Sequence, residues 1–271
     1  MSPRRKVPAP PAGQMRLNRF LSLAGFTSRR KADEMISDGL VSVNGRVVLD
    51  LGHKIDPDRD SVYVHGRQIS VVREFVYVLL NKPKDAITTM SDERGRRTVM
   101  DYVRMKERVY PVGRLDRNTT GVLLLTNDGD LANQLMHPRH EFQKAYKATL
   151  DRVLTPEHAR MLSEGIRLPE GRTRPADVVM IPGGKNKVVG VVIHEGKNRQ
   201  IHRMFESLGY SVEKLDRVAY AGLTYEGIPR GRWRLLTVRE VDHLKHLLQE
   251  ERRPGGRGEQ CPAGELVISS P

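Results

Sequence analysis

Residues 111–126 read PVGRLDRNTTGVLLLT. The last part of this segment, residues 122–125, is apolar at every position, which predicts a strand buried on both faces. A polar loop held by such a strand is a common location for catalytic side chains. Asp116 lies in this loop with Arg114 and Arg117 close to it, and nearby arginines favour an ionised carboxylate. Such a carboxylate suits a nucleophile or a general base, and it equally suits a structural ion pair.

Strand-like and helix-like segments alternate around this loop, through residues 75–250. Strands are expected at 75–80, 121–126, 145–150, 188–193 and 233–238. Helices are expected at 130–136, 156–164, 199–208 and 239–248. Many connections are too short for crossover helices, so antiparallel pairing should dominate. We therefore expect an α+β domain in which helices flank a mainly antiparallel mixed sheet.

A smaller unit precedes this domain, at residues 15–61. Its apolar spacing predicts two short helices, the second with Ser28 as its N-cap and Ala32, Met35 and Ile36 facing inward. Alternating valines then surround Asn44-Gly45, a pair typical of a tight hairpin turn. The unit is predicted to fold as helix, helix, hairpin.

The charge of the chain points to a polyanionic partner. Lys and Arg number 46 against 33 Asp and Glu, which gives a net charge of +13. An excess of this size favours nucleic acid or an anionic membrane surface. Residues 15–32 contain no acid and five of the basic residues, which are Arg16, Arg19, Arg29, Arg30 and Lys31. We interpret this cluster as a phosphate-binding surface, although a solvated basic face would have the same composition.

Several other classes of protein are excluded. The longest apolar run, residues 75–80, is far shorter than the ~18 residues of a membrane span, and no apolar stretch follows the basic N-terminus. A lone cysteine, Cys261, excludes an intramolecular disulfide framework and a cysteine-based zinc site. A soluble, cytoplasmic protein is expected. Residues 1–14, which are basic, and residues 251–271 are rich in proline or glycine and are predicted to be flexible tails.

Metal and nucleotide chemistry find little support in the sequence. His137 and His140 are separated by Pro138 and lack a clustered third ligand, so no metal site is expected. Gly183-Gly184-Lys185 lacks the spacing and the hydroxyl residue of a phosphate-binding loop.

Five motifs together resemble one family. Gly-Arg-Leu-Asp at 113–116 is similar to the signature of pseudouridine synthases. Three further motifs resemble the RsuA/RluB/RluF branch of that family: TTG at 119–121 followed by TNDG at 126–129, KAY at 144–146, and EGKNRQIHRM at 195–204. Residues 15–61, with SRRKA at 28–32 and VNG at 43–45, resemble an S4 RNA-binding domain. The resemblance covers about residues 15–250 in the family's order.

The resemblance implies an architecture and an activity. It implies an S4-like domain with its linker at 15–74 and a pseudouridine synthase domain at 75–250. These enzymes isomerise uridine in RNA to pseudouridine without a cofactor, an intramolecular transfer. Within the branch, the length and the S4 unit favour ribosomal RNA of the large subunit as the partner, bound by a monomer.

The resemblance also implies roles for individual residues. Asp116 would be the catalytic residue, acting on ribose C1′ or on the 2′ proton. Tyr146 would stack on the flipped uracil, although the strand pattern alone also fits a core tyrosine. Arg199 would pair with the catalytic aspartate, although paired helix arginines are often only solvated. Four more residues would contact RNA, namely Arg114, Arg117, Lys144 and Arg203. His202 stands where the branch often has a second arginine, which we expect to tune RNA contact.

Two other functions remain open from the sequence. One is a non-catalytic RNA-binding factor for ribosome assembly, which the intact Asp116, Tyr146 and Arg199 argue against. The other is a hydrolase of glycosidic bonds, which needs a second carboxylate facing the first. Asp128 and Glu195 are the candidates for that second carboxylate.

Overall fold

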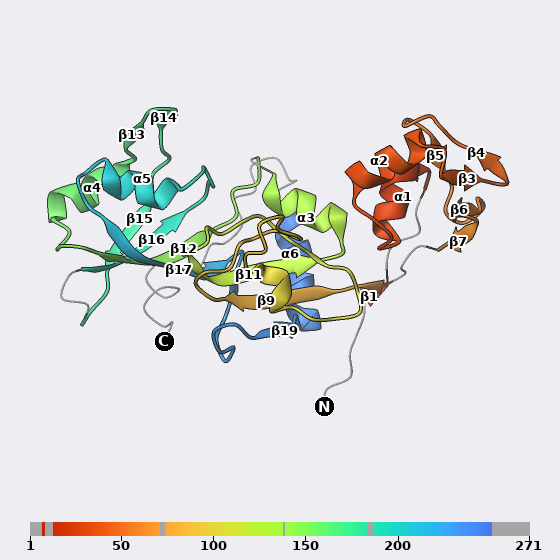
Figure 1. The fold of residues 1–271 in the computed structure, drawn as a ribbon. Helices are drawn as coiled ribbons and strands as arrows, with labels where there is room; N and C mark the ends of the chain where they lie inside the picture. The colour runs from red at the N-terminus through yellow and green to blue at the C-terminus, as the bar shows by residue number, and fades with distance from the viewer. Residues whose placement is uncertain (1–6, 9–12, 71–73, 138, 184–186, 251–271) are drawn as a thin grey trace. The chain divides into compact units, whose positions relative to one another are not determined.

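The computed structural model describes residues 7–8, 13–70, 74–137, 139–183 and 187–250 (Figure 1). The chain divides into two compact units. The first comprises residues 1–76, 105–109 and 126–129, and the second comprises the rest. Val7–Pro8 (β1) pairs with Glu74–Phe75 (β8), so two residues of the expected N-terminal tail lie in a short ladder. Residues 1–6, 9–12 and the expected tail at 251–271 lie outside the described residues.

The N-terminal unit consists of two helices and small antiparallel ladders. Its helices are α1 (Leu17–Leu23) and α2 (Arg29–Ser37). One sheet has the order β4-β3-β6-β7, with bounds Arg46–Val47, Val41–Val43, Val62–Val64 and Arg67–Ile69. A separate ladder joins β2 (Met15–Arg16) to β5 (Lys54–Ile55). The predicted order of helix, helix and hairpin is confirmed.

Local sequence explains these elements. The Ser28 hydroxyl accepts a hydrogen bond from the Lys31 amide at 3.2 Å, so Ser28 caps α2 as predicted. Asn44 and Gly45 both have positive φ, 50° and 80°, as the tight turn between β3 and β4 requires. Ala32, Met35 and Ile36 are buried in the small core of this unit. Hydrophobic burial, rather than helix length, therefore holds these short elements together.

The second unit is built on one large sheet. Within the described residues it has nine strands, in the order β15-β16-β12-β17-β11-β9-β19, with β10 beside β11 and β18 beside β17. In that order the first seven span Asp177–Met180, Val188–Ile193, Lys144–Leu150, Val212–Tyr220, Thr120–Thr126, Tyr77–Lys82 and Trp233–Leu235. The two side strands are Tyr110–Pro111 (β10) and Leu223–Thr224 (β18). A separate two-stranded ladder joins β13 (Arg167–Leu168) and β14 (Gly171–Arg172).

Pairing in the large sheet is mixed. β11 runs parallel to β17, whereas β12 pairs antiparallel with both β16 and β17. β15 is antiparallel to β16, and β19 is antiparallel to β9. The expected α+β class with a mainly antiparallel sheet is confirmed.

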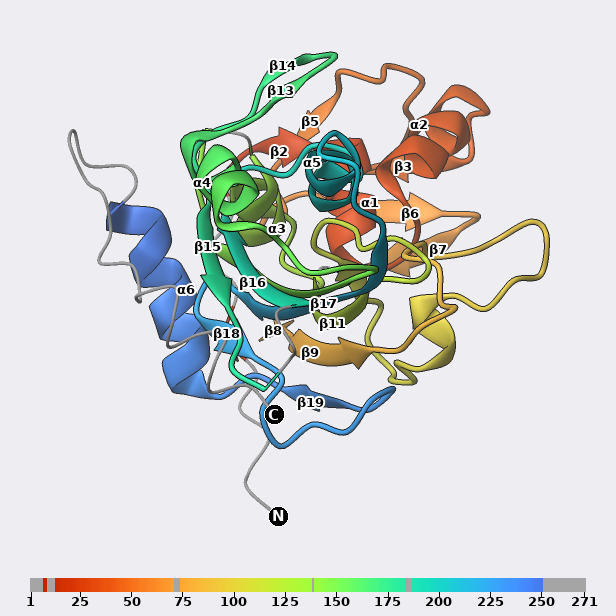
Figure 2. The ribbon, with the colours of Figure 1, turned by 90° about the vertical axis from the view of Figure 1, so that its left-hand side faces the viewer.

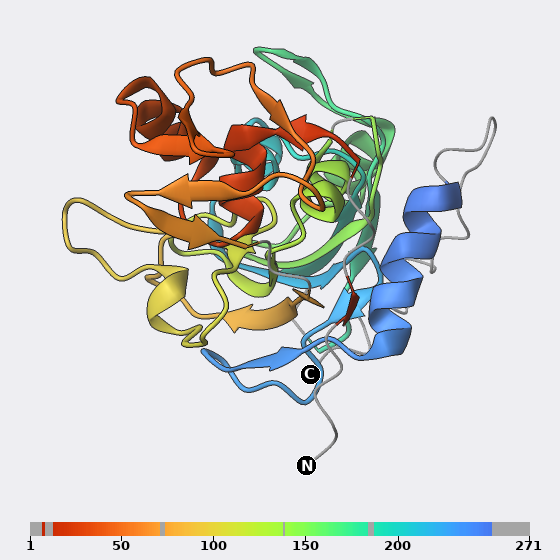
Figure 3. The same cartoon turned by 90° about the vertical axis from the view of Figure 1, so that its right-hand side faces the viewer.

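Helices cover both faces of the sheet. They are α3 (Gly129–Met136), α4 (Pro156–Glu164), α5 (Gln200–Glu206) and α6 (Val238–Glu250), with a short 3-10 turn at Val99–Asp101. Figure 2 shows α4 and α5 on one side of the strands, and Figures 2 and 3 show α6 on the other. Among the described residues, no helix has both the length and the apolar character needed to cross a membrane.

Several predicted bounds need correction. The strand expected at 233–238 ends at Leu235, because Thr237 and Glu240 exchange hydrogen bonds that begin α6. The strand expected at 75–80 is β9, shifted to Tyr77–Lys82. The central strand β17 was not predicted at all. Its charged residues hide the strand pattern.

Candidate active site

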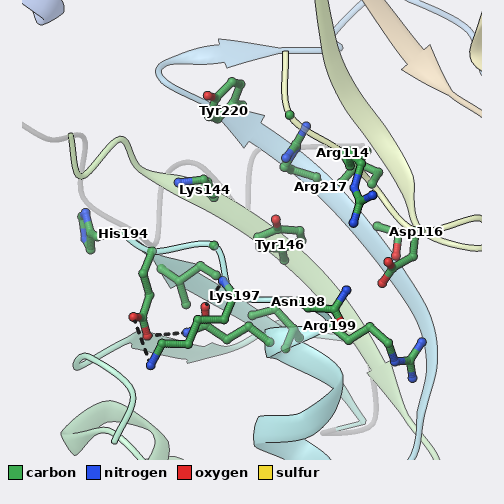
Figure 4. A pocket seen from close by; sticks show the side chains of 18 of the residues that line it. Arg114, Asp116, Lys144, Tyr146, His194, Lys197, Asn198, Arg199, Arg217 and Tyr220 are labelled. Carbon is green, nitrogen blue, oxygen red and sulfur yellow. Dashed lines mark hydrogen bonds and ion pairs between the residues drawn. The ribbon is translucent and has the colours of Figure 1, made fainter. Parts of the chain in front are cut away.

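A pocket of about 670 Å³ opens on the second unit (Figure 4). It is lined by the loop around Asp116, by β12, by residues 193–202 and by β17. Five predicted site residues line it, namely Arg114, Asp116, Lys144, Tyr146 and Arg199. The pocket therefore gathers segments that are far apart in the sequence around one carboxylate.

The backbone around Asp116 is fixed by a buried lysine. Lys82, at the end of β9, has no exposed surface. Its ammonium donates hydrogen bonds to the carbonyls of Asp116 (3.0 Å), Arg117 (3.1 Å) and Thr119 (2.8 Å). Burial lowers the pKa of Lys82 to about 8, while the Asp116 charge acts in the opposite direction. One side chain thus fixes three backbone carbonyls of the loop that carries Asp116.

Thr88 fixes the other side of the same loop. Its hydroxyl donates to the Leu115 carbonyl at 2.8 Å and accepts from the Leu115 amide at 3.2 Å. The residue before Asp116 is therefore held at both backbone groups. The Asp116 carboxylate itself makes no hydrogen bond or ion pair with any described residue. It is positioned through its backbone, and its oxygens are left for a ligand.

A close approach of β11 to β17 places a second charged group in the pocket. Gly121 lies opposite Arg217 in the parallel register and has a φ of +103°. A Cβ at Gly121 would lie 2.2 Å from the Arg217 carbonyl oxygen, so the approach requires glycine. The strands can therefore come together where the loop ends.

Arg217 is the main pocket residue that the sequence did not reveal. Its side chain is 4% exposed, and its Nε donates to the Val122 carbonyl at 2.9 Å. The guanidinium lies 4.9 Å from the centre of the Tyr220 ring, and one of its terminal nitrogens has no hydrogen-bond partner among the described residues. The sequence feature that could have revealed Arg217 is the pair Asp216-Arg217, which interrupts an otherwise strand-like stretch.

Tyr146 lines the pocket beside Arg217. It lies on β12 and is 8% exposed. It pairs with Arg217 in the antiparallel β12–β17 ladder. Figure 4 shows Tyr146, Arg114, Arg217 and Asp116 around the same hollow. An aromatic ring beside cationic groups and a carboxylate suits a flat, polar ligand.

Lys144 lines the same pocket at the start of β12. Its ammonium donates to the Phe142 carbonyl at 3.0 Å and lies 5.8 Å from the Tyr220 ring centre. Burial and the Arg217 charge together lower the pKa of Lys144 to about 8, against the opposing effect of Glu195. This lysine therefore loses its charge at a lower pH than an ordinary lysine does.

The loop before α5 forms one wall. Glu195 accepts hydrogen bonds from the Gln200 amide group at 2.6 Å and the Arg174 backbone amide at 3.0 Å, and it lies 3.5 Å from Lys197. These contacts occupy the Glu195 carboxylate. They make it a structural anchor rather than the second catalytic carboxylate of a hydrolase.

The expected pairing of Arg199 with Asp116 is not seen. Arg199 lines the pocket with a φ of 47°, and its guanidinium lies 3.5 Å from the Glu206 carboxylate. Arg203 pairs with Glu170 at 2.5 Å and does not line the pocket. The two arginines therefore have different partners: Arg199 pairs with the last residue of α5, and Arg203 pairs with a residue between β13 and β14.

The other predicted RNA-contact residues fall into two groups. Arg114 lines the pocket, whereas the Arg117 guanidinium forms an ion pair with the Asp85 carboxylate at 2.5 Å. In the N-terminal unit, Arg29, Arg30 and Lys31 are exposed in the first turn of α2, and Lys31 pairs with Glu34 at 2.7 Å. Arg16 is exposed before α1, and Arg19 is half-buried within it. Across the described ranges, no group of three or more His, Cys, Asp or Glu side chains could hold a metal ion.

Comparison with known proteins agrees with this geometry. Residues 76–207 match the family described as RNA pseudouridylate synthase, and residues 15–60 match the S4 domain. The ribosomal large subunit pseudouridine synthase B of Bacillus subtilis is 44% identical over 236 residues, which cover 86% of this chain and 96% of that protein. The Vibrio cholerae protein of the same name is 38% identical, covering 86% and 75%.

A solved structure supports the same assignment. The crystal structure of a pseudouridylate synthase superposes with a TM-score of 0.63 at 28% identity, covering 85% of this chain and 99% of that one. The sequence motifs, the pocket around Asp116 and these similarities agree, and the chain belongs to the RNA pseudouridine synthase family.

Proposed function

We propose that this enzyme converts a specific uridine of large-subunit ribosomal RNA into pseudouridine, with Asp116 as its catalytic residue. The bond from ribose C1′ to uracil N1 breaks, the base turns, and a bond from C1′ to C5 forms. The C5 proton leaves and a proton is gained at N1, so the atoms balance without a cofactor. The Bacillus subtilis relative is named for the large subunit, which supports that choice of RNA.

One observation carries the proposal. The Asp116 carboxylate faces a polar pocket without a hydrogen bond or ion pair to any described residue, while Lys82 and Thr88 hold the backbone around it. A fixed carboxylate with free oxygens can attack C1′ or remove the 2′ proton. Either route requires that the ribose of a flipped nucleotide enter this pocket.

The remaining pocket residues bind the flipped nucleotide. Tyr146 supplies a ring on which the uracil stacks, a contact worth ~1–3 kcal/mol per base. Arg199 lines the pocket together with Asp116 and orients the nucleotide (Figure 4). Arg114 and Lys144 hold the flanking phosphates inside the pocket.

Basic side chains outside the pocket bind the rest of the RNA. On the second unit, which we call the synthase unit, these are Arg117 and Arg203, each of which forms an ion pair with an acidic residue. On the N-terminal unit, which we call the S4 unit, they are Arg16, Arg19, Arg29, Arg30 and Lys31. We infer that the enzyme acts as a monomer, in the cytoplasm where ribosomal RNA is available.

The Asp116→Asn variant tests this proposal. A transcript of large-subunit ribosomal RNA is incubated with each protein, and pseudouridine is mapped by chemical modification and primer extension. The wild type should form pseudouridine at one position, which is also lost in ribosomal RNA from cells lacking the chain. Asp116→Asn should reduce conversion by at least 10³-fold, on the order of a lost catalytic group, and keep its RNA affinity.

Three results would contradict the proposal. Conversion by Asp116→Asn at a substantial rate would remove Asp116 from the chemistry. Release of free uracil would indicate hydrolysis. Tight binding by the wild type with no conversion of any transcript would indicate an assembly factor.

A further inference from the structure

A second hollow lies on the synthase unit, apart from the Asp116 pocket. It has a volume of about 660 Å³ and shares no lining residue with that pocket. A single segment, between β9 and β10, supplies its walls: Met90, Ser91, Asp92, Gly95, Arg96, Arg97, Thr98, Met100, Asp101, Tyr102 and Arg104. We call it the 90–104 groove. No catalytic role has been assigned to any of its residues.

Both acids of the groove are occupied by neighbours from the same segment. Asp92 accepts from the Arg96 guanidinium at 2.7 and 3.2 Å. Those hydrogen bonds lower the pKa of Asp92 to about 2. Asp101 accepts from the Thr98 amide at 2.7 Å and closes a capping box. Both carboxylates therefore shape the groove, and the Arg96 guanidinium compensates the charge of Asp92.

Two arginines of the groove have no such partner. The side chains of Arg97 and Arg104 are exposed and make no hydrogen bond or ion pair with any described residue. Tyr102 lines the groove with a partly buried ring. Free guanidinium groups and an aromatic ring in one groove are the combination that binds phosphates and stacked bases of single-stranded nucleic acid.

We propose that the 90–104 groove binds an unpaired stretch of the substrate RNA, with Arg97 and Arg104 on phosphates and Tyr102 against a base. This inference rests on the proposed function, because RNA is the substrate that brings an unpaired strand to this unit. An acidic protein segment would satisfy the arginines but would leave the ring of Tyr102 without a planar partner.

A short series of hydrogen bonds connects the groove to the loop that carries Asp116. The Arg97 carbonyl accepts from the Ile87 amide at 2.9 Å, and the Ile87 carbonyl accepts from the Val99 amide at 2.9 Å. The next residue, Thr88, holds both backbone groups of Leu115 beside Asp116. RNA bound in the groove would therefore lie on the same segment that supports the catalytic loop.

Binding of a labelled RNA tests the groove directly. The probe is a fluorescein-labelled 12-nucleotide oligouridine, titrated by anisotropy into full-length protein from 0.05 to 0.3 M salt. Two lost phosphate contacts should lower the slope of log Kd against log salt by about 1.4 in Arg97→Gln/Arg104→Gln. At 0.1 M salt this change in slope corresponds to an RNA affinity about 25-fold weaker than that of the wild type. Tyr102→Leu should weaken binding by about 5-fold or more.

The matched control removes the same charge elsewhere. Arg160→Gln/Arg239→Gln changes two exposed arginines of the same unit that line neither hollow. A groove variant that matches this control in affinity and slope would overturn the proposal. Circular dichroism spectra that match the wild type would show that the variants are folded.

A cross-link provides a readout that does not depend on stability. Oligouridine containing 4-thiouridine is irradiated with the wild-type protein, and the attached peptide is found by mass spectrometry. Attachment within residues 90–104 supports the groove, and attachment only elsewhere overturns it. Failure of the proposed function is seen separately, as a wild type that forms no pseudouridine in the ribosomal transcript. If the wild type does form it, an unchanged groove variant counts against the groove alone.

Discussion

Tyr146 and Arg217 lie opposite each other across the antiparallel β12–β17 ladder, so their side chains emerge on the same face of the sheet. Both line the Asp116 pocket, and both are less than a tenth exposed. The ladder register therefore sets the distance between the aromatic surface and the buried positive charge. A sheet fixes such a relationship more rigidly than a loop can.

The hydroxyl of Tyr146 is expected to matter for rate more than for binding. It makes no hydrogen bond to a described protein group, so it is available to carry the C5 proton of uracil. Tyr146→Phe should keep RNA affinity within about twofold, since the ring still stacks, while the single-turnover rate falls. Tyr146→Leu should also weaken binding, by roughly 5- to 150-fold. An unchanged rate for Tyr146→Phe would leave the ring with stacking alone.

RNA affinity should depend on pH through Lys144. Because the pKa of Lys144 is lowered to about 8, its ammonium loses its charge as pH rises from 7 to 9, well before an ordinary lysine does. The Kd of the wild type should therefore rise over this interval. The Kd of Lys144→Arg, which stays charged, should change less with pH. Lys144→Met should bind RNA more weakly than the wild type, with a Kd that also changes little with pH. A wild-type profile that matches Lys144→Arg would contradict a role for this proton.

Gly121 should be intolerant of a side chain. Gly121→Ala places a Cβ 2.2 Å from the Arg217 carbonyl at a φ of +103°, so the two strands must separate or the backbone must change. We expect a loss of about 2 kcal/mol or more in the free energy of unfolding, measured by urea titration, together with reduced activity. Gly227→Ala is the control, because Gly227 also has positive φ but nothing within 4 Å of the new Cβ. Similar losses for the two variants would show that only φ strain matters.

The basic turn of α2 should contribute to RNA binding through charge alone. Arg29, Arg30 and Lys31 are exposed, and removing all three should lower the salt slope of log Kd by up to about 2 to 3. The measurement is a titration of the ribosomal transcript at several salt concentrations. The rate of conversion at saturating RNA should stay near the wild-type value. A slope equal to that of the wild type would show that the S4 unit binds RNA elsewhere.

Local sequence was sufficient for most individual elements. α4 and β16 have the predicted bounds, because Thr155 and Pro156 mark a helix start and because Val188–Ile193 is an apolar run. The capped second helix and the Asn-Gly turn of the N-terminal unit likewise follow from residues next to each other in the chain. Asp116 could be singled out for the same reason, since its loop and its strand are adjacent.

The environment of the site depended on contacts between distant segments. β17 escaped prediction because its charged residues are satisfied by partners that the local pattern does not reveal, such as the Val122 carbonyl that accepts from Arg217. Lys82 is fully buried only because three carbonyls of the Asp116 loop meet its ammonium. Arg199 is an exception, because the carboxylate it meets, Glu206, lies only seven residues further along, at the other end of α5.

The sequence by itself determined the family motifs, the local helices and strands, and the carboxylate at the centre of the site. Tertiary structure decided which charges are buried beside that carboxylate and which are paired away from it. The physical reason is that a buried charge needs several polar partners at once, and here those partners come from segments 34 to 95 residues away along the chain.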